Sequence, residues 1–174
     1  RRPPRSTLFP YTTLFRICEV NLPDQVKTTL ELFKDTENIE FRVKWPHESK
    51  VIIYADKEHI NGIFSNLFKN SIQAVPADRK GIINILMEVA RDKVLVSVSD
   101  NGCGIPLSLR KKIFTPNFTT KSSGTGLGLS IVKKYVEEAN GSIRFESDAD
   151  KGTTFYMEFP LKYTVEKPGR AIPE

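Results

Sequence analysis

The spacing of apolar residues along the chain predicts three helices and six strands. Apolar positions recur at helical spacing in residues 21–33, 56–75 and 126–139. Pro76 ends the second helix, and Asn140-Gly141 is a typical signal for the end of the third. Six other short segments, rich in apolar or alternating positions, predict strands at residues 39–45, 51–54, 81–90, 93–99, 142–147 and 153–159.

The order of these elements predicts the fold class. The strands come in adjacent pairs separated by helices, which favours a mixed or antiparallel sheet over repeating βαβ units. We therefore expect an α+β fold, a two-layer α/β sandwich whose mixed, mostly antiparallel sheet is covered on one face by three helices. Residues 105–123 are long, polar and proline-containing, with only a short helical pattern at 107–113. Loops of that length inside a compact domain are usually functional lids.

The charge distribution argues against nucleic-acid binding. The formal net charge is +5, but four arginines within residues 1–16 contribute +4, and the remainder has 22 basic against 21 acidic residues. A phosphate-binding patch needs clustered excess charge, which the folded part lacks. Cys18 and Cys103 fit no metal spacing, so we expect free thiols in a reduced, cytoplasmic protein with no membrane contact by this part of the chain.

The length of 174 residues suits one domain with a real core. Residues 5–16 have no helical period and resemble translated sequencing-adapter sequence, so we expect 1–16 to be a non-native or poorly packed leader. We expect the domain to span 17–161 and a flexible tail to occupy 162–174.

Two asparagines on the second predicted helix are the first candidates for chemistry. Asn66 and Asn70 are four residues apart and therefore point the same way, beside an apolar stripe. Asparagine is an indifferent helix former, so an aligned pair suggests a role. A neutral amide oxygen can ligate Mg²⁺ without repelling a triphosphate. The alternative is a pair of hydrogen-bonded amides that face the sheet.

A carboxylate and two glycines follow the strand at 93–99. Asp100 at a strand end can accept a hydrogen bond from an adenine amino group, while Gly102 and Gly104 let a flat ring approach the backbone. The alternative is an ordinary Asp-Asn-Gly turn, and such turns are common.

Three alternating glycines, Gly124, Gly126 and Gly128, stand immediately before the third predicted helix. Free backbone amides at a helix start form a phosphate site. The spacing fits neither a Walker loop nor the dinucleotide fingerprint, because Leu129 and Ser130 follow the last glycine. The alternative is a flexible hinge.

In this order and spacing, NLFKN, DNGCGI, a phenylalanine-containing lid and GTGLGLS resemble the four nucleotide-binding boxes of sensor histidine kinases. That family belongs to the ATPase class with the Bergerat fold, which also includes gyrase, Hsp90 and MutL. The resemblance covers roughly residues 21–161. The segments around NSIQAVPADRKG and FTPNFTTKSSGTGLGLSIV are especially similar to sensor kinases of the nitrogen-regulation type.

The resemblance implies a Mg-ATP site and a role for each matching residue. Asn70 would be the Mg²⁺ ligand, with Asn66 beside the metal or phosphates, and Asp100 would hold the adenine amino group. Thr153 would bond through water to the adenine side. The remaining implied nucleotide-binding residues would approach the phosphates, shape the pocket, anchor the lid or cradle the phosphates, and they are Lys69, Gly102, Gly104, Ile105, Phe114, Phe118, Lys121, Gly124, Thr125, Gly126, Leu127, Gly128 and Leu129.

The resemblance also separates kinase from hydrolase. The relatives that hydrolyse ATP carry a glutamate four residues before the metal-binding asparagine, where this chain has Asn66, and an amide cannot take a proton. Asn66 and Lys121 are the candidates for a catalytic role. A sensor kinase phosphorylates a histidine on a preceding helical hairpin, and neither His47 nor His59 lies in such a context. We expect His59 to lie at the surface of its helix.

These features predict an ATP-dependent protein-histidine kinase domain of a two-component system. The implied partners are an upstream histidine-bearing dimerisation domain and, through it, a response regulator, and the fragment would not complete autophosphorylation alone. The full-length protein would be free or membrane-anchored. Two alternatives remain, a serine kinase of the anti-sigma-factor type and a nucleotide-sensing module that transfers no phosphoryl group.

Overall fold

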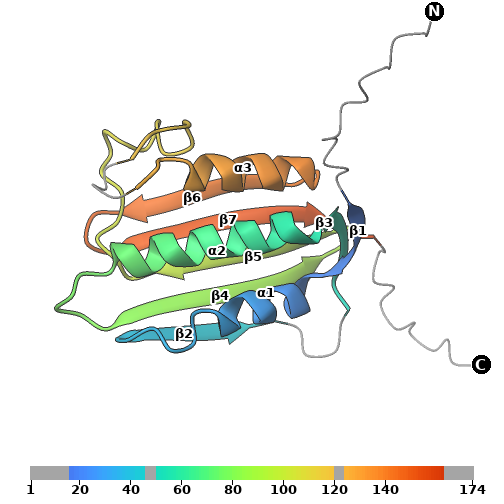
Figure 1. Ribbon diagram of the computed structural model, residues 1–174, viewed down its shortest axis with the longest axis horizontal. Helices are drawn as coiled ribbons and strands as arrows, with labels where there is room; N and C mark the ends of the chain where they lie inside the picture. Colours follow the sequence, from blue (N-terminus) through green and yellow to red (C-terminus); the bar gives the residue numbers. More distant parts are fainter. Residues whose placement is uncertain (1–15, 46–49, 120–123, 163–174) are drawn as a thin grey trace, which may run out of the picture.

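The computed structural model of the chain describes residues 16–45, 50–119 and 124–162. In Figure 1 the helices lie together on one face of a sheet. In chain order the elements are β1 (Ile17–Asn21), α1 (Leu22–Glu31), β2 (Ile39–Lys44), β3 (Ile52–Asp56), α2 (Lys57–Ala74), β4 (Gly81–Ala90), β5 (Lys93–Asp100), α3 (Gly128–Glu138), β6 (Ser142–Asp148) and β7 (Gly152–Pro160).

The main sheet has five strands in the order β2-β4-β5-β7-β6. Among the described strands of this sheet, only β2 and β4 run parallel, and the other three pairs are antiparallel. The expected α+β sandwich, with a mixed and mostly antiparallel sheet under three helices, is therefore confirmed. Within the described ranges, none of the helices is long and apolar enough to cross a membrane.

The strands β2 and β3 follow each other along the chain but do not pair with each other. β2 pairs with β4, and β3 forms a separate two-stranded sheet with β1. The pattern analysis missed β1 altogether, because its five residues (ICEVN) carry only two aliphatic side chains beside a segment set aside as a leader. The side chain of Asn21 accepts a hydrogen bond from the Val51 amide at 3.2 Å, which ties β1 to the start of β3.

The core lies between the main sheet and the helices. Alternate residues of β4, β5 and β7 point inward, so that one side of each strand is buried. The largest fully buried side chains come from both layers, and they are Phe64, Phe68, Phe159, Leu22, Ile53, Ile60, Ile63, Leu67, Ile83, Ile85, Met87 and Met157. Both cysteines are exposed free thiols.

Both ends of α3 have a clear cause. Asn140 takes a left-handed φ of 55°, and the Gly141 amide donates to the Val136 carbonyl at 2.9 Å, which closes the helix as predicted. The helix begins two residues later than expected, at Gly128, because Gly126 has a φ of +69° that no helix contains. Residues 107–114 form consecutive turns rather than a helix.

The expected leader and tail fall almost entirely on residues 1–15 and 163–174, which lie outside the described residues. At the borders, the Arg16 amide donates to Asp56 Oδ2 at 3.3 Å, and the Lys162 amide donates to the Ile52 carbonyl at 2.9 Å. The expected tail therefore begins with a residue that is bonded to β3.

Candidate functional site

The Asp100 carboxylate, at the end of β5, is buried and firmly held. Its Oδ1 accepts hydrogen bonds from the Gly102 amide at 2.9 Å and the Thr153 amide at 3.2 Å. Its Oδ2 accepts one from the Ser71 hydroxyl of α2 at 3.2 Å. Asp100 and Ser71 are only 8% and 1% exposed, so this carboxylate is fixed before any ligand arrives.

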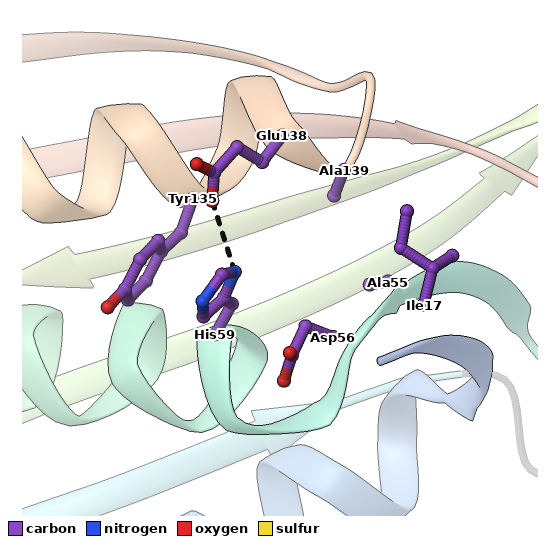
Figure 2. Close-up of a pocket in the computed structure, with 7 residues that line it drawn as sticks. All are labelled: Ile17, Ala55, Asp56, His59, Tyr135, Glu138 and Ala139. Atoms are coloured by element: carbon purple, nitrogen blue, oxygen red, sulfur yellow. Dashed lines mark ion pairs between the residues drawn. The ribbon is translucent and has the colours of Figure 1, made fainter. Parts of the chain in front are cut away.

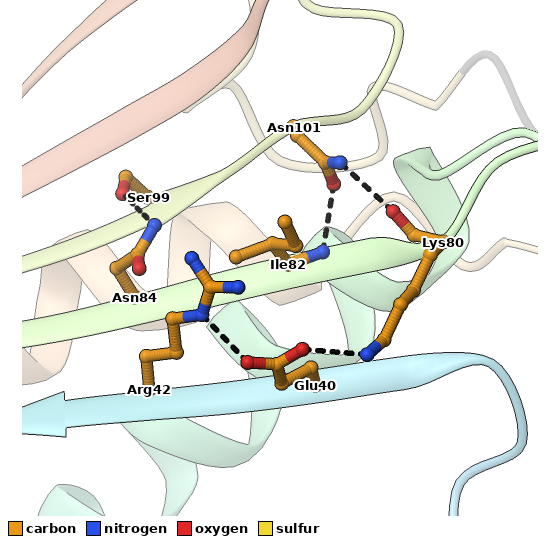
Figure 3. Close-up of polar contacts among 7 residues, drawn as sticks. All are labelled: Glu40, Arg42, Lys80, Ile82, Asn84, Ser99 and Asn101. Carbon is orange, nitrogen blue, oxygen red and sulfur yellow. Dashed lines mark hydrogen bonds and ion pairs between the residues drawn. The ribbon is translucent and has the colours of Figure 1, made fainter.

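The Asp-Asn-Gly turn is attached to β4 by the side chain of Asn101, as Figure 3 shows. Asn101 Oδ1 accepts from the Ile82 amide at 2.8 Å, and its Nδ2 donates to the Lys80 carbonyl at 2.9 Å. On the neighbouring strands, Glu40 bridges Arg42 and Lys80 at 2.7 and 2.6 Å. The hydrogen bonds and charges of Arg42 and then Lys80 lower the pKa of Glu40 from 4.5 to about 2.

The glycines of this turn are required by protein packing. A Cβ on Gly102 would lie 2.6 Å from the Ala74 carbonyl oxygen, and one on Gly104 would lie 2.1 Å from the Asp148 carbonyl oxygen. Gly104 also has a φ of +73°. The turn therefore packs closely between the end of α2 and the β6–β7 hairpin. This packing requires glycine for a reason other than the approach of a flat ring, which the sequence suggested.

The asparagine pair of α2 faces the start of α3. A Cβ on Gly128 would lie 3.0 Å from Asn66 Oδ1 and 3.9 Å from Asn70 Nδ2. Asn66 Nδ2 donates back to the Gly62 carbonyl at 2.8 Å, which leaves its oxygen beside Gly128. Asn66 and Asn70 are half-buried, whereas Lys69 lies on the exposed side of the helix.

The first turn of α3 has the features of an anion site. The side chain of Leu127, the N-cap residue, makes no capping hydrogen bond, and the first amides of the helix have no acceptor four residues earlier within the helix. Gly124, Thr125 and Leu127 are exposed, while Leu129 is half-buried and packs on the core. Lys121, the predicted phosphate contact, lies outside the described residues.

Two phenylalanines of the predicted lid, residues 105–123, pack against other parts of the chain. Phe114 packs edge-on against Phe145 of β6 and Phe155 of β7, with ring centroids 5.9 and 6.5 Å away. Phe118 is half-buried, and a Cβ on Gly126 would lie 2.7 Å from its amide nitrogen.

The root of the lid is bound to β6 by residues that the sequence analysis missed. The half-buried Ile105 donates its amide to Ser147 Oγ at 2.8 Å. Arg110 Nε donates to the Ile105 carbonyl at 3.1 Å, and its guanidinium also bonds the Ser147 carbonyl. No pattern in the sequence marks Ser71, Ser147 or Arg110, because their roles depend on partners 29 to 42 residues away.

Two cavities in the described part of the chain bear on the predicted site residues. The larger, of about 470 Å³, is lined by Asp100 and Thr153 among the predicted site residues, together with Arg110 and Ser147. The smaller, of about 200 Å³ and shown in Figure 2, contains none of the predicted nucleotide residues.

The smaller cavity corrects the expectation for His59. Its ring stacks on Tyr135 at 3.8 Å between centroids, and its Nδ1 lies 3.1 Å from Glu138 Oε2 (Figure 2). The side chain is only 18% exposed rather than on the surface, because α3 covers this side of α2. His47 lies outside the described residues.

Comparison with known proteins shows which family of proteins this chain is similar to. The sequence profile of the family described as histidine kinase-, DNA gyrase B- and HSP90-like ATPase matches residues 55–163. Sporulation kinase C of Bacillus subtilis (strain 168) is 32% identical over 154 residues, which are 88% of this chain and 36% of that protein. The signal transduction histidine-protein kinase AtoS of Escherichia coli (strain K12) is 38% identical over 147 residues, 82% of this chain and 24% of AtoS.

The fold agrees with solved structures. The catalytic domain of histidine kinase ThkA superposes with a TM-score of 0.73 at 36% identity, and the match covers 83% of this chain and 95% of that domain. ThkA in complex with the response regulator protein TrrA superposes with a TM-score of 0.68 at 33% identity, over 84% of this chain and 42% of that one. The match therefore covers 95% of the solved ThkA catalytic domain, whereas the chain spans only about a quarter to a third of the length of the curated kinases.

Proposed function

This chain belongs to the family of histidine kinase-, DNA gyrase B- and HSP90-like ATPases, and we propose that it binds Mg-ATP and donates the γ-phosphate to a histidine on a separate dimerisation domain. The resemblance to the ATP-binding domain of sensor histidine kinases is confirmed by the ThkA catalytic domain. Membership of this family implies ATP binding, whereas the metal, the transfer step and the partners belong to the proposal.

The observation that carries the proposal is the position of the asparagine pair. Along α2, Asn66 and Asn70 lie beside Gly128, where the first amides of α3 begin, and Ser71 bonds Asp100. From Asn66 to Ala74 the helix rises about 12 Å. One nucleotide can lie along this stretch, with its adenine amino group on Asp100, its ring between the turn and Thr153, and its phosphates at the start of α3.

The residues present fit a magnesium ion. Within the described ranges, no three His, Cys, Asp or Glu side chains come together to hold a metal. A neutral amide from Asn70, with Asn66 beside it, suits an ion whose other ligands are phosphate oxygens and water. When bound there, Mg²⁺ would neutralise phosphate charge. Lys69 and Lys121 are proposed to approach the phosphates.

The side chain of Asn66 favours transfer over hydrolysis. Its amide donates to its own helix and cannot accept a proton from water. The γ-phosphate is therefore presented to an incoming imidazole, whose nitrogen forms the new bond to phosphorus as the bond to the ADP oxygen breaks. His59 is a poor acceptor, because it is held by Tyr135 and Glu138 and lies about 16 Å from Asn70 along the helix.

The proposed partners follow from this division of labour. The acceptor histidine would lie on a helical dimerisation domain, and a response regulator would take the phosphoryl group from it. The solved complex of ThkA with the response regulator protein TrrA supports that assignment. We also propose that residues 17–161 form the catalytic domain, that 1–16 and 162–174 lie outside it, and that it works in the cytoplasm.

Radiolabelled ATP tests the proposal in one experiment. The chain is incubated alone and with a dimeric helical domain that bears an acceptor histidine, taken from a similar sensor kinase. We expect phosphate release close to background without the partner and labelled partner with it. Asn70→Ala should abolish the labelling, while Asn84→Ala, a matched change at an exposed residue of β4, should leave it intact. Robust phosphate release by the chain alone, lost in Asn70→Ala, would identify a hydrolytic ATPase instead.

A further inference from the structure

We infer that Ser147, near the end of β6, is a positioning residue that makes the base pocket select adenine, because it fixes the direction of the Thr153 hydroxyl hydrogen. The inference rests on the proposed function, since it concerns the base of the bound nucleotide. It assigns a role to a side chain 7% exposed that matches no nucleotide-binding box.

Ser147 Oγ has three polar neighbours within hydrogen-bonding distance. It lies 3.0 Å from the Gly152 carbonyl oxygen, 2.8 Å from the Ile105 amide nitrogen and 2.9 Å from Thr153 Oγ1. Thr153 is 5% exposed, so bulk water does not compete with these contacts. The hydroxyl of Ser147 is therefore the centre of a small buried network.

The chemistry of the neighbours determines which group donates to which. A hydroxyl has one hydrogen and two lone pairs. The Gly152 carbonyl can only accept, so it takes the hydrogen of Ser147. The Ile105 amide can only donate, so it occupies one lone pair. The remaining lone pair faces Thr153, and hence the Thr153 hydroxyl must donate to Ser147.

Thr153 then has only lone pairs left for the pocket. The Asp100 carboxylate, whose Oδ1 accepts the Thr153 amide at 3.2 Å, is also purely an acceptor. Asp100, Ser147 and Thr153 all line the cavity of about 470 Å³. Adenine carries an amino donor where guanine carries an oxygen acceptor. At that position of the base, a wall that can only accept favours the adenine amino group and opposes the guanine oxygen.

The ratio of ATP to GTP affinity tests the inference. In Ser147→Ala the Thr153 hydroxyl loses its acceptor and is free to donate to guanine. The preference for ATP should then fall by roughly twofold to tenfold, the value of one neutral hydrogen bond. Competition titrations of both nucleotides on the whole chain measure the ratio, and thermal melting confirms the fold. Ser142→Ala, the same change at an exposed position of β6, should leave the ratio unchanged.

Ser147→Ala also deprives the Ile105 amide of its acceptor, so it could lower the stability of the chain. A second variant tests the inference independently of that effect. Thr153→Val removes an acceptor from the wall, so ATP affinity should fall while GTP affinity stays or rises. Adding Ser147→Ala to Thr153→Val should not change the ratio again, because the hydroxyl through which Ser147 acts is gone.

The outcomes separate this inference from the proposed function. A wild-type chain that binds no ATP would contradict both. A wild-type chain that prefers ATP, with an unchanged ratio in Ser147→Ala, would overturn the role of Ser147 alone. Equal losses of ATP and GTP affinity in Thr153→Val would overturn it as well, since they would show that Thr153 reads no difference between the bases.

Discussion

The substitution Asp100→Asn tests the base end of the site with the smallest possible change of shape. Two backbone amides, those of Gly102 and Thr153, donate to Oδ1. An asparagine must therefore keep its carbonyl oxygen at that position, because an NH₂ group there would meet two donors. Its NH₂ group is therefore forced to the position of Oδ2. In the wild-type chain, Oδ2 accepts a hydrogen bond from the Ser71 hydroxyl, and we propose that it also binds the adenine amino group.

The orientation of the amide sets the size of the effect. The adenine amino group loses a hydrogen bond to a charged acceptor and meets a second donor. Loss of such a bond costs about 1.5–3 kcal/mol, which corresponds to roughly a tenfold to more than a hundredfold loss of ATP affinity. Guanine presents an oxygen acceptor at this position, so GTP affinity should hold or improve. The two bonds to the backbone persist, and the melting temperature should change little.

Titration of a fluorescent ATP analogue, displaced by unlabelled ATP or GTP, measures both affinities. Asp92→Asn is the matched control, because Asp92 is exposed in the turn between β4 and β5. Equal binding of ATP and GTP by the wild-type chain would show that Asp100 only builds a turn. An Asp100→Asn chain that keeps its ATP affinity and its melting temperature would refute the assignment of the adenine amino group to Oδ2.

Three further substitutions test other parts of the fold. Gly128→Ala places a methyl group 3.0 Å from Asn66 Oδ1, so Asn66 must move and Mg-ATP affinity should fall about tenfold while adenosine affinity holds, as calorimetry can measure. Glu40→Gln should cost a little stability at neutral pH; because the pKa of Glu40 is lowered from 4.5 to about 2, the difference from wild type should shrink as the pH falls through that window, and a pH-independent difference in urea unfolding would contradict the ion-pair account. His59→Ala removes the stack on Tyr135 and should lower the free energy of unfolding by about 1–3 kcal/mol without changing ATP affinity, whereas a loss of affinity would place His59 in the nucleotide site.

The elements most visible in the sequence were those whose patterns are local. The period of α2 and the alternation of β4 and β5 each reflect one face packed on the core, and both elements were predicted within one or two residues. The pairing of β3 was not readable, because a strand of five residues carries no label for its neighbour. Its partner β1 lies more than 30 residues upstream.

The residues of the candidate site also divide into those that belong to a local sequence pattern and those that do not. Asp100 and the glycines belong to contiguous motifs, so their positions could be read directly from the chain. Ser71, Arg110 and Ser147 support those motifs from other elements, and a lone serine or arginine has no pattern of its own. Gly102 and Gly104 were recognised for a plausible reason, but the structure adds the close approach of Ala74 and Asp148, which only tertiary packing reveals.

The two ends of the proposed nucleotide site differ in how firmly they are held, and this difference suits the proposed transfer of a phosphoryl group to a partner. The base end consists of buried side chains, Asp100, Ser71 and Thr153, whose hydrogen bonds exist before a ligand binds. The proposed phosphate end consists of exposed residues such as Thr125 and Leu127 and of the first amides of α3, which the side chain of Leu127 does not cap. If the proposed site is right, base selection is a property of the folded domain alone, at little cost in ordering on binding. A phosphate chain bound at an open end remains accessible to an imidazole that approaches from outside, which a fully enclosed site would exclude.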